Sequence, residues 1–472
     1  MIAEETWERF TLDELPPLNR AILARAQAPS ALVHALNTRV LPALPPPAAL
    51  TPWQARRLVV HLGLWGSSVS RHLQEADLSL LERPEVTLEV LHAGAAGVPF
   101  QAYFAEVALR TGAGHAPRDT YASLVRWNVP TVDVVWQGER LVTLEGAFEG
   151  PHVRTYTGDP GEVLFLVLLK KAEALEAAAN ELIEPLAAGD AGYDHDAEES
   201  LARMRRAASL LLAVHHTNHQ FTATGEGGAM LLSADHFIDV LRQFAVHWRR
   251  GDVPPSGAQD PEYLARDLLL GIEFPGYDVH VRRVFPALLE EERERLERWM
   301  SRPSLPHRVL LAAGFGPADL AAASADALLE MARRWPSLAA CYLLMRANAK
   351  VSSSHLGLTK RFLFNPMRAR DRQGIADSPL VSNRAGTTGM LEQLLERLNR
   401  GRQEHLLSPF ARVPLPELEA IAGAAAHDAG EPVALLRSEG RENQAENGRG
   451  TLGAPISRWR REDPASGGPI SR

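Results

Sequence analysis

The stretch SSSHLGLTKRFLFNP (352–366) carries the helical pattern on which the fold prediction rests. Leu358, Thr359 and Phe362 follow His355 at +3, +4 and +7, which is the spacing of one face of an α-helix. Such a face normally packs against a core. A histidine there is most often a buried structural residue with one backbone partner, and less often a metal ligand. The stretch therefore predicts a core-facing helix and leaves two interpretations of His355.

The same periodicity extends over most of the chain. The segment GEVLFLVLLKKAEALEAAANELIEPLAAG (161–189) begins a long helical stretch, and the tripeptide GDP before it is a helix-start signal. Helical segments continue to about residue 410, with breaks such as GEGG and DVPPSGAQDP between them. These patterns predict a large all-helical domain over residues 151–412.

The first 150 residues are mixed in character. LPALPPPAALTP (41–52) is typical of a proline-rich connector. DLSLLERPEVTLEVL (77–91) and TVDVVWQGERLVTLEGAF (131–148) carry alternating β-branched residues, and the second segment predicts a hairpin around WQGER. We therefore expect a mainly α protein with a smaller mixed α/β domain over residues 1–150. The polar end of residues 413–472 predicts a flexible, disordered tail.

Composition limits the classes of partner. The chain has 472 residues, 45% of them hydrophobic, and a net charge of -8. This charge gives no general attraction to nucleic acid or to an anionic membrane. The N-terminus has no apolar run typical of a signal peptide, and no stretch is long enough to span a membrane. A single cysteine, Cys341, excludes an intrachain disulfide and cysteine-based zinc or iron–sulfur sites. We expect a cytoplasmic protein; composition leaves its oligomeric state open and is compatible with a monomer.

Three short motifs offer candidate chemistry. In HHTNH (215–219), His215 and His219 are four residues apart and could share a helix face, although a surface pair is the commoner outcome. GTTG (386–389) opens a helix and could bind an anion or serve as a plain N-cap. Phe237 and Arg242, five residues apart, could hold an aromatic amino acid, with the guanidinium on its carboxylate.

The surroundings of His355 suit a haem. A haem needs one imidazole that projects from a rigid helix into an apolar slot, with basic or hydroxyl groups at the rim for its propionates. AKVSSSHLGLTKRF (349–362) offers serines, lysines and an arginine around one histidine. There is no CxxCH motif, so a covalently attached c-type haem is excluded.

Several of these segments resemble segments of one protein family, and they occur in the same order along the chain as in that family. SSSHLGLTKRFLFNP and AGTTGMLEQLLERLNRGRQEHLL (385–407) resemble the closing segment of the indoleamine 2,3-dioxygenases. HFIDVLRQFAVHW (236–248), TYASLVRWN (120–128) and LFLVLLKKAEA (164–174) resemble earlier segments of that family. The segments APRDTYASLVRWNVPTVD and RTYTGDPGEVLFLVLLKKAEALEAA are also similar to monodechloroaminopyrrolnitrin synthase, a haem protein of the same superfamily that rearranges a chlorinated tryptophan.

The resemblance implies a haem b cofactor and a set of site residues. His355 would be the proximal iron ligand, and Arg242 would meet the substrate carboxylate. Phe237 would form an aromatic wall, Tyr121 would lie at the pocket edge, and Val167 would lie on the distal helix. Thr387 and Thr388 would lie in the loop after the proximal helix. Where some relatives have an arginine for a haem propionate this chain has Ser352, so we expect Lys350 or Lys360 to make that contact.

The function expected from the resemblance is a haem dioxygenase. It would use O₂ to cleave the indole ring of tryptophan or a related indole, giving an N-formylkynurenine-type product. An apolar pocket without an acid–base side chain would fit that reaction. The segment RRGDVPPSGAQDPEYLARDLLLGI (249–272) replaces the family's Gly/Ser-rich loop, which favours a related alternative: a secondary-metabolic enzyme that oxidises or rearranges a modified tryptophan or tyrosine. A haem-binding protein without turnover is the third reading.

Overall fold

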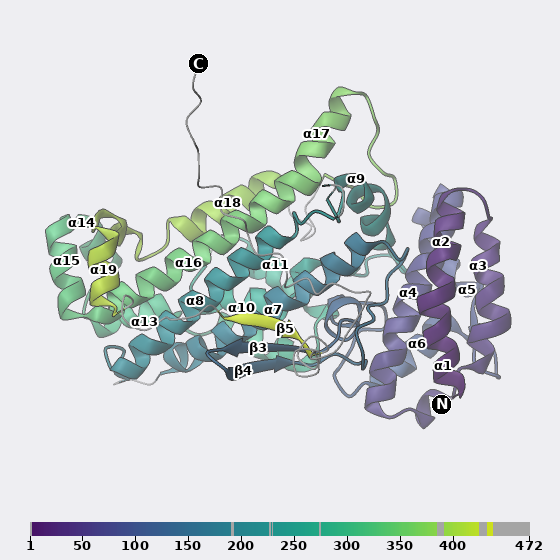
Figure 1. The fold of residues 1–472 in the computed structure, drawn as a ribbon, viewed down its shortest axis with the longest axis horizontal. Coiled ribbons are helices and arrows are strands. Elements are labelled where there is room, and N and C mark those ends of the chain that lie inside the picture. The colour runs from purple at the N-terminus through teal and green to yellow at the C-terminus, as the bar shows by residue number, and fades with distance from the viewer. Residues whose placement is uncertain are drawn as a thin grey trace, which may run out of the picture.

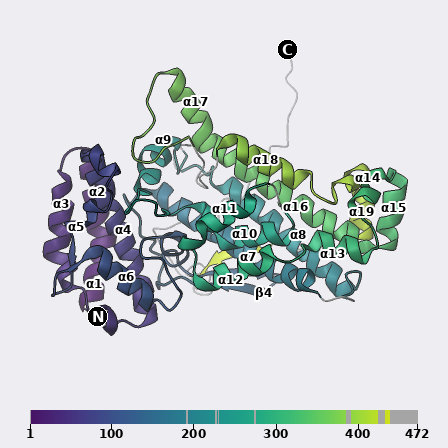
Figure 2. The same cartoon turned by 180° about the vertical axis from the view of Figure 1, so that it is seen from behind.

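A computed structural model describes residues 2–189, 193–225, 228, 230–272, 275–384, 391–423 and 432–437. The described residues are mainly helical, which confirms the predicted class. Figures 1 and 2 show an elongated molecule, with the first helices of the chain gathered at one end and long helices running through the rest. No helix among the described residues is long and apolar enough to cross a membrane.

The N-terminal helices pack around α4 (Pro52–Ala76), which is buried along most of its length. Its start is well defined, because the Thr51 hydroxyl accepts from the Gln54 N–H, the Gln54 side chain accepts from the Thr51 N–H, and Pro52 takes the first helical position. The other elements of this end are α1 (Ile2–Arg9), η1 (Phe10–Glu14), α2 (Leu15–Leu23), α3 (Pro29–Ala35), η2 (Leu36–Val40), η3 (Leu41–Ala43), η4 (Pro47–Ala49), η5 (Leu78–Leu81), α5 (Val86–Glu89), β1 (His92–Ala93), β2 (Val98–Pro99) and α6 (Phe100–Arg110).

This end contains less strand than predicted. The alternating segment 77–91 is not extended; it forms η5 and α5. Local capping explains the difference, because the Asp77 carboxylate accepts from the Ser79 N–H and the Thr87 hydroxyl donates to the Pro84 carbonyl. Only β1 and β2, two residues each, pair here.

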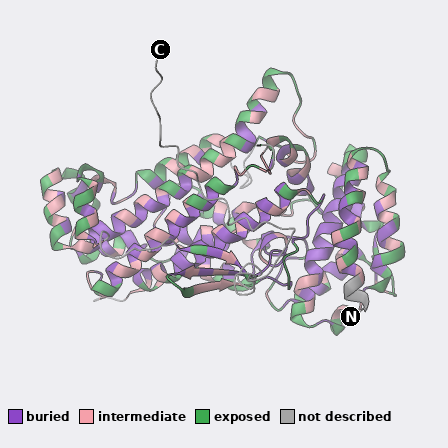
Figure 3. Ribbon diagram, viewed as in Figure 1, coloured by how far each residue is buried: buried purple, intermediate pink, exposed green. Residues whose placement is uncertain are grey.

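Four long helices make the middle of the molecule: α7 (Pro160–Ala188), α8 (Glu198–Gln220), α16 (Pro336–Thr359) and α18 (Glu392–Gln403). α8 packs against α7 and α16, and α16 also packs against α18 (Figure 1). α7 starts as the GDP tripeptide predicts, since the Asp159 carboxylate accepts from the Gly161 N–H at 2.7 Å. Figure 3 shows that buried residues dominate α4 and α7, whereas the projecting α17 (Asn365–Arg372) is mostly exposed or half-buried.

Shorter elements complete the helical part. They are η6 (Ala122–Arg126), α9 (Ala234–His236), η8 (Phe237–Leu241), η9 (Arg242–Phe244), η10 (Gly257–Gln259), α10 (Pro261–Leu269), α11 (Tyr277–Val284), η11 (Phe285–Ala287), α12 (Glu290–Met300), α13 (Leu305–Ala312), α14 (Pro317–Ala322), α15 (Ala325–Arg334), η12 (Lys360–Phe364), η13 (Ser408–Arg412) and α19 (Leu415–Ile421). In Figures 1 and 2, α13–α15 and α19 lie at the end opposite α1–α6.

The predicted hairpin is present as β3 (Val132–Trp136) and β4 (Glu139–Leu144). Gln137 and Gly138 form its turn with φ of 52° and 83°, a pair of left-handed conformations that matches the twist of the two strands. A third strand, β5 (Val433–Leu436), pairs antiparallel with the other edge of β3, and the strand order is β4-β3-β5. All three strands pack against α7.

The hairpin, which the pattern places in a domain over residues 1–150, packs on α7 of the predicted large domain. Residues 413–472 were predicted to be a flexible tail, but this range contains α19 and β5. The polar composition that suggested the tail belongs mainly to residues 438–472, which lie outside the described residues.

Candidate functional site

A cavity of about 770 Å³ lies between α7, α8, α16 and the segment from residue 237 to residue 260. Its size is typical of small-molecule sites. Most of its wall is apolar, with Leu166, Leu169, Val214, Leu241, Leu358 and Phe362 among the lining residues. The cavity therefore offers an apolar chamber in which a few polar side chains can orient a ligand.

His355 projects from α16 into this cavity. Val351, Leu358, Thr359 and Phe362 line the wall beside it, so the predicted helix face is correct but faces a cavity rather than a filled core. Burial, together with the charges of the nearby arginines Arg402 and Arg266, lowers the pKa of His355 to about 4. The imidazole is therefore neutral at pH 7, the form that binds metals. Within the described ranges no hydrogen bond engages its ring nitrogens.

Phe237 and Arg242 both lie in the cavity wall, at the start of η8 and of η9. The Phe237 ring is 5.5 Å from that of Phe165 on α7 and 6.4 Å from that of Phe362 beyond α16. Arg242 Nη2 donates to the Ser382 carbonyl at 2.9 Å. Burial lowers the pKa of Arg242 to about 10, although the Asp377 carboxylate opposes this shift. The guanidinium is thus a half-buried cation in the same cavity wall as the Phe237 ring.

Tyr121 closes another part of the wall. Its side chain is buried, and its backbone N–H donates to Gln259 Oε1 at 2.9 Å. Its hydroxyl donates to Asp260 Oδ2 over 3.5 Å. Burial raises the pKa of Tyr121 well above its ordinary value, and the Asp260 charge adds to this, so the phenol keeps its proton.

The structure separates Val167 from these residues. Phe165, Leu166, Leu169, Ala172 and Glu176 line the cavity, and at 100° per residue they share one face of α7. Val167 falls on the opposite face; it is buried but does not line the cavity. The prediction that Val167 shapes the pocket is therefore not borne out, because its side chain is not part of the cavity wall.

Other predicted contacts also fall elsewhere or cannot be placed. Lys350 and Lys360 do not line the cavity, and Lys360 Nζ instead pairs with Glu396 on α18 at 2.5 Å. His280 and Arg283 on α11 do line the cavity; burial and the charge of Arg283 lower the pKa of His280, so Arg283 is the cation of the two. Thr387 and Thr388 lie outside the described residues.

Carboxyl groups in the cavity wall were missed by the sequence analysis. Glu176 and Asp260 both line the cavity, which corrects the expectation of a pocket without an acid–base side chain. Glu176 could have been found, because it continues the face that Leu169 and Ala172 occupy at helical spacing. Asp260 comes from the loop before α10, whose path no local pattern predicts.

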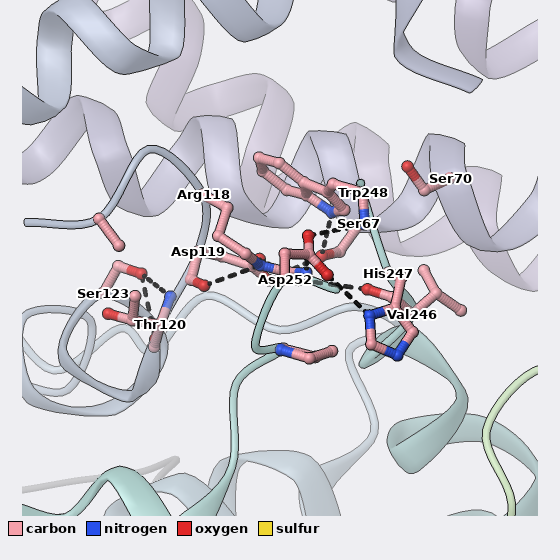
Figure 4. Close-up of polar contacts among 12 residues, drawn as sticks. Ser67, Ser70, Arg118, Asp119, Thr120, Ser123, Val246, His247, Trp248 and Asp252 are labelled. Atoms are coloured by element: carbon pink, nitrogen blue, oxygen red, sulfur yellow. Dashed lines mark hydrogen bonds and ion pairs between the residues drawn. The ribbon is translucent and has the colours of Figure 1, made fainter. Parts of the chain in front are cut away.

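A buried polar cluster anchors the loop that contains Asp260. Asp252 accepts from Arg118 Nη1 at 2.6 Å, from His247 Nδ1 at 2.7 Å and from the Trp248 N–H at 3.0 Å (Figure 4). Arg118 also pairs with Asp119 at 2.6 Å. These contacts tie the start of the loop to the segment before η6, and most of residues 251–260 then line the cavity.

The histidine cluster at the end of α8 lies apart from the cavity. The Nε2 atoms of His215 and His219 are 3.3 Å apart, and His215 Nδ1 is 3.2 Å from the Lys350 carbonyl. The two histidines do share a helix face, as predicted. Among the residues that the structure describes, no group of three or more histidine, cysteine or acidic side chains is arranged to hold a metal ion.

Comparisons with known proteins do not identify a function for this site. No protein-family model matches the chain, and no curated protein matches it. Function is therefore inferred from the cavity itself: the neutral His355 imidazole, an aromatic surface with the half-buried Arg242, and the carboxyl groups of Glu176, Asp252 and Asp260 in the wall.

Proposed function

We propose that the protein is a haem-dependent dioxygenase that cleaves the ring of tryptophan or a related indole with O₂. The observation that carries the proposal is the His355 imidazole, which has no hydrogen-bond partner within the described ranges and faces an apolar cavity. Phe237 and Arg242 in the same cavity supply an aromatic contact and a cation. A histidine, an aromatic wall and an arginine in one chamber suit a haem and an aromatic acid together.

The side chains present fit haem b. His355 would hold the iron, because imidazole is a common axial ligand. Leu358 and Phe362 would contact the porphyrin face, and His280 and Arg283 would meet its carboxylates. When bound, haem supplies the activation of O₂ that no protein side chain provides.

The chain itself would bind and orient the substrate. Arg242 would pair with the substrate carboxylate, and Phe237 and Phe165 would contact the ring. The apolar walls would exclude water from the reacting atoms. In the proposed reaction the indole C2–C3 bond breaks and both oxygen atoms of O₂ enter an N-formylkynurenine-type product, so no second oxidant is needed.

A second candidate function is favoured by the acidic wall. Glu176 and Asp260 can hold or accept a proton at the substrate, which indole cleavage does not require. Their presence favours an enzyme that oxidises or rearranges a modified tryptophan or tyrosine. The two candidates share the cofactor and the cavity and differ in the substrate ring.

Haem binding by His355 is tested with a matched pair of variants. Protein reconstituted with haem is expected to show a Soret band, and His355→Ala is expected to lose it. His405→Ala is the control, because His405 is also buried with a pKa lowered by burial to about 4, yet it does not line the cavity. Equal haem content in His355→Ala and the parent protein would refute the ligand assignment.

Substrate assignment is tested on the reduced, haem-loaded protein. With tryptophan and O₂ the first candidate predicts the absorbance of formylkynurenine. Product or spectral shifts only with substituted indoles or tyrosine would support the second candidate. Haem binding without turnover or shifts for any aromatic amino acid would support a haem carrier instead.

A further inference from the structure

The cavity has two chemically different ends along α7. Phe165 and Glu176 are eleven residues apart on the lining face, which places their backbones about 16 Å apart along the helix axis. Phe165 contacts Phe237, so its end is the aromatic end near η8 and Arg242. Glu176 marks the other end, where Asp260 and Tyr121 also line the wall.

The end formed by Glu176, Asp260 and Tyr121 is here called the acidic end. Glu176 Oε1 accepts from Arg266 at 2.5 Å, whereas Oε2 is buried and has no hydrogen-bond partner among the described residues. Asp260 Oδ1 is used by the N–H groups of Glu262 and Tyr263 at the start of α10, which leaves Oδ2 with only the long contact to the Tyr121 hydroxyl. Two carboxyl oxygens at this end thus lack a close donor.

The charges around the acidic end are unbalanced toward the negative. Glu173 and Glu176 on α7 and Glu262 and Asp267 on α10 each pair with an arginine, namely Arg126, Arg266, Arg295 and Arg402, whereas Asp260 has no ion pair within the described ranges. Burial and these neighbouring carboxylates raise the pKa of Glu176 to about 7 and that of Asp260 well above its ordinary value. An incoming hydrogen-bond donor would stabilise the ionised form of these carboxyl groups.

We propose that the acidic end binds a hydroxyl or amino group on the far edge of the substrate ring, so that the ligand is a ring-hydroxylated or ring-aminated aromatic amino acid. The ligand would lie along α7 with its carboxylate toward Arg242 and its ring donor on Glu176 Oε2 and Asp260 Oδ2. This inference deepens the proposed function, on which it rests for the orientation of the ligand.

Selectivity follows from the unpaired oxygens. A site built to bind a substrate O–H or N–H discriminates strongly against the analogue that lacks it, because that analogue leaves buried acceptors unpaired. An unsubstituted ring would press carbon against Glu176 Oε2. We therefore expect phenylalanine to bind more weakly than 4-aminophenylalanine and tyrosine, and tryptophan more weakly than 5-hydroxytryptophan.

The test measures ligand binding to the haem-loaded protein by calorimetry with these ligands. We expect 4-aminophenylalanine to bind about tenfold or more tightly than phenylalanine. Glu176→Gln should abolish this ratio, because its carbonyl can still accept from Arg266 and its amide nitrogen then faces the cavity as a donor. Asp260→Asn should reduce the ratio while retaining a side chain that caps α10. Glu181→Gln, exposed on the same helix, should leave the ratio unchanged.

The outcomes separate this inference from the proposed function. Equal affinities for both members of each pair in the parent protein would overturn the inference, whether or not haem binds. A preference that persists in both Glu176→Gln and Asp260→Asn would also overturn it. If the protein does not bind haem, the same titrations are made on the haem-free protein, and a retained preference for the ring donor would then overturn the haem proposal and leave the acidic end supported.

Discussion

Asp252→Ala is expected to release the loop that forms one wall of the cavity. The carboxylate accepts four hydrogen bonds, from Arg118, His247 and the N–H groups of Trp248 and Arg249. Removing one partner of a buried ion pair costs about 3–5 kcal/mol. Arg118 keeps its contact with Asp119, so we place the loss at the lower limit, about 3 kcal/mol, for local opening of the loop.

Amide hydrogen exchange measures this loss where it occurs. A change of about 3 kcal/mol corresponds to exchange roughly a hundredfold faster at Trp248 and Arg249. The Tyr121 N–H, which donates to Gln259 in the same loop, should also exchange faster. Asp252→Asn should have a smaller effect, about tenfold, because its carbonyl can still accept from Arg118 and the backbone N–H groups while its amide turns toward His247.

The control is Asp278→Ala, an exposed position on α11, which should leave the exchange of all three amides unchanged. Unchanged protection of the Tyr121 amide in Asp252→Ala would refute the idea that this carboxylate positions the cavity loop. Faster exchange across the whole protein would instead show a general loss of stability.

Three further predictions concern the scaffold. Gly66→Ala should lower the free energy of unfolding by about 1–3 kcal/mol, because its Cβ would lie 2.6 Å from the buried Trp248 ring; an unchanged melting temperature would contradict this. The Glu162 carboxylate raises the pKa of His236 above its ordinary 6.5 in spite of burial, so His236 should stabilise the fold below pH 6.5 and lose this effect as pH rises through the folded pKa. The melting-temperature gap between parent and His236→Gln should therefore shrink from pH 5.5 to pH 9, and a constant gap would argue against the pair. A chain that ends at residue 431 should melt lower than one that ends at residue 440, since only the shorter chain lacks β5; equal melting temperatures would refute a structural role for that strand.

Periodicity predicted the helical part of the fold well because its helices bury one continuous face. The helix face that begins at His355 is a clear case. The hairpin was also predictable, because the turn at Gln137 and Gly138 depends on local sequence. Periodicity failed at residues 77–91, where two side chains cap short turns, and at β5, whose pairing partner lies about 300 residues earlier. Long-range pairing leaves no local signal.

The candidate site followed the same rule. His355 lies on the regular helix α16, so helical spacing indicates the face on which it reaches the cavity wall. Phe237 and Arg242 begin the π-helical η8 and the 3-10 helix η9, and they reach the same wall through this irregular backbone. Asp260 depends on an irregular loop held by Asp252, and no pattern within that loop indicates where its side chain points. The resemblance placed Val167 on the distal helix, but helix phase puts it on the wrong face for contact with the cavity.

The pairing of β5 with β3 has a consequence for synthesis of the chain. Residues 433–436 are made after every described helix, yet they complete a sheet whose central strand is residues 132–136. One edge of β3 therefore stays unpaired until the ribosome has added some 300 further residues. An unpaired strand edge readily pairs with other chains. A nascent chain stalled between residues 136 and 433 would expose that edge, so we expect aggregation during this interval of synthesis.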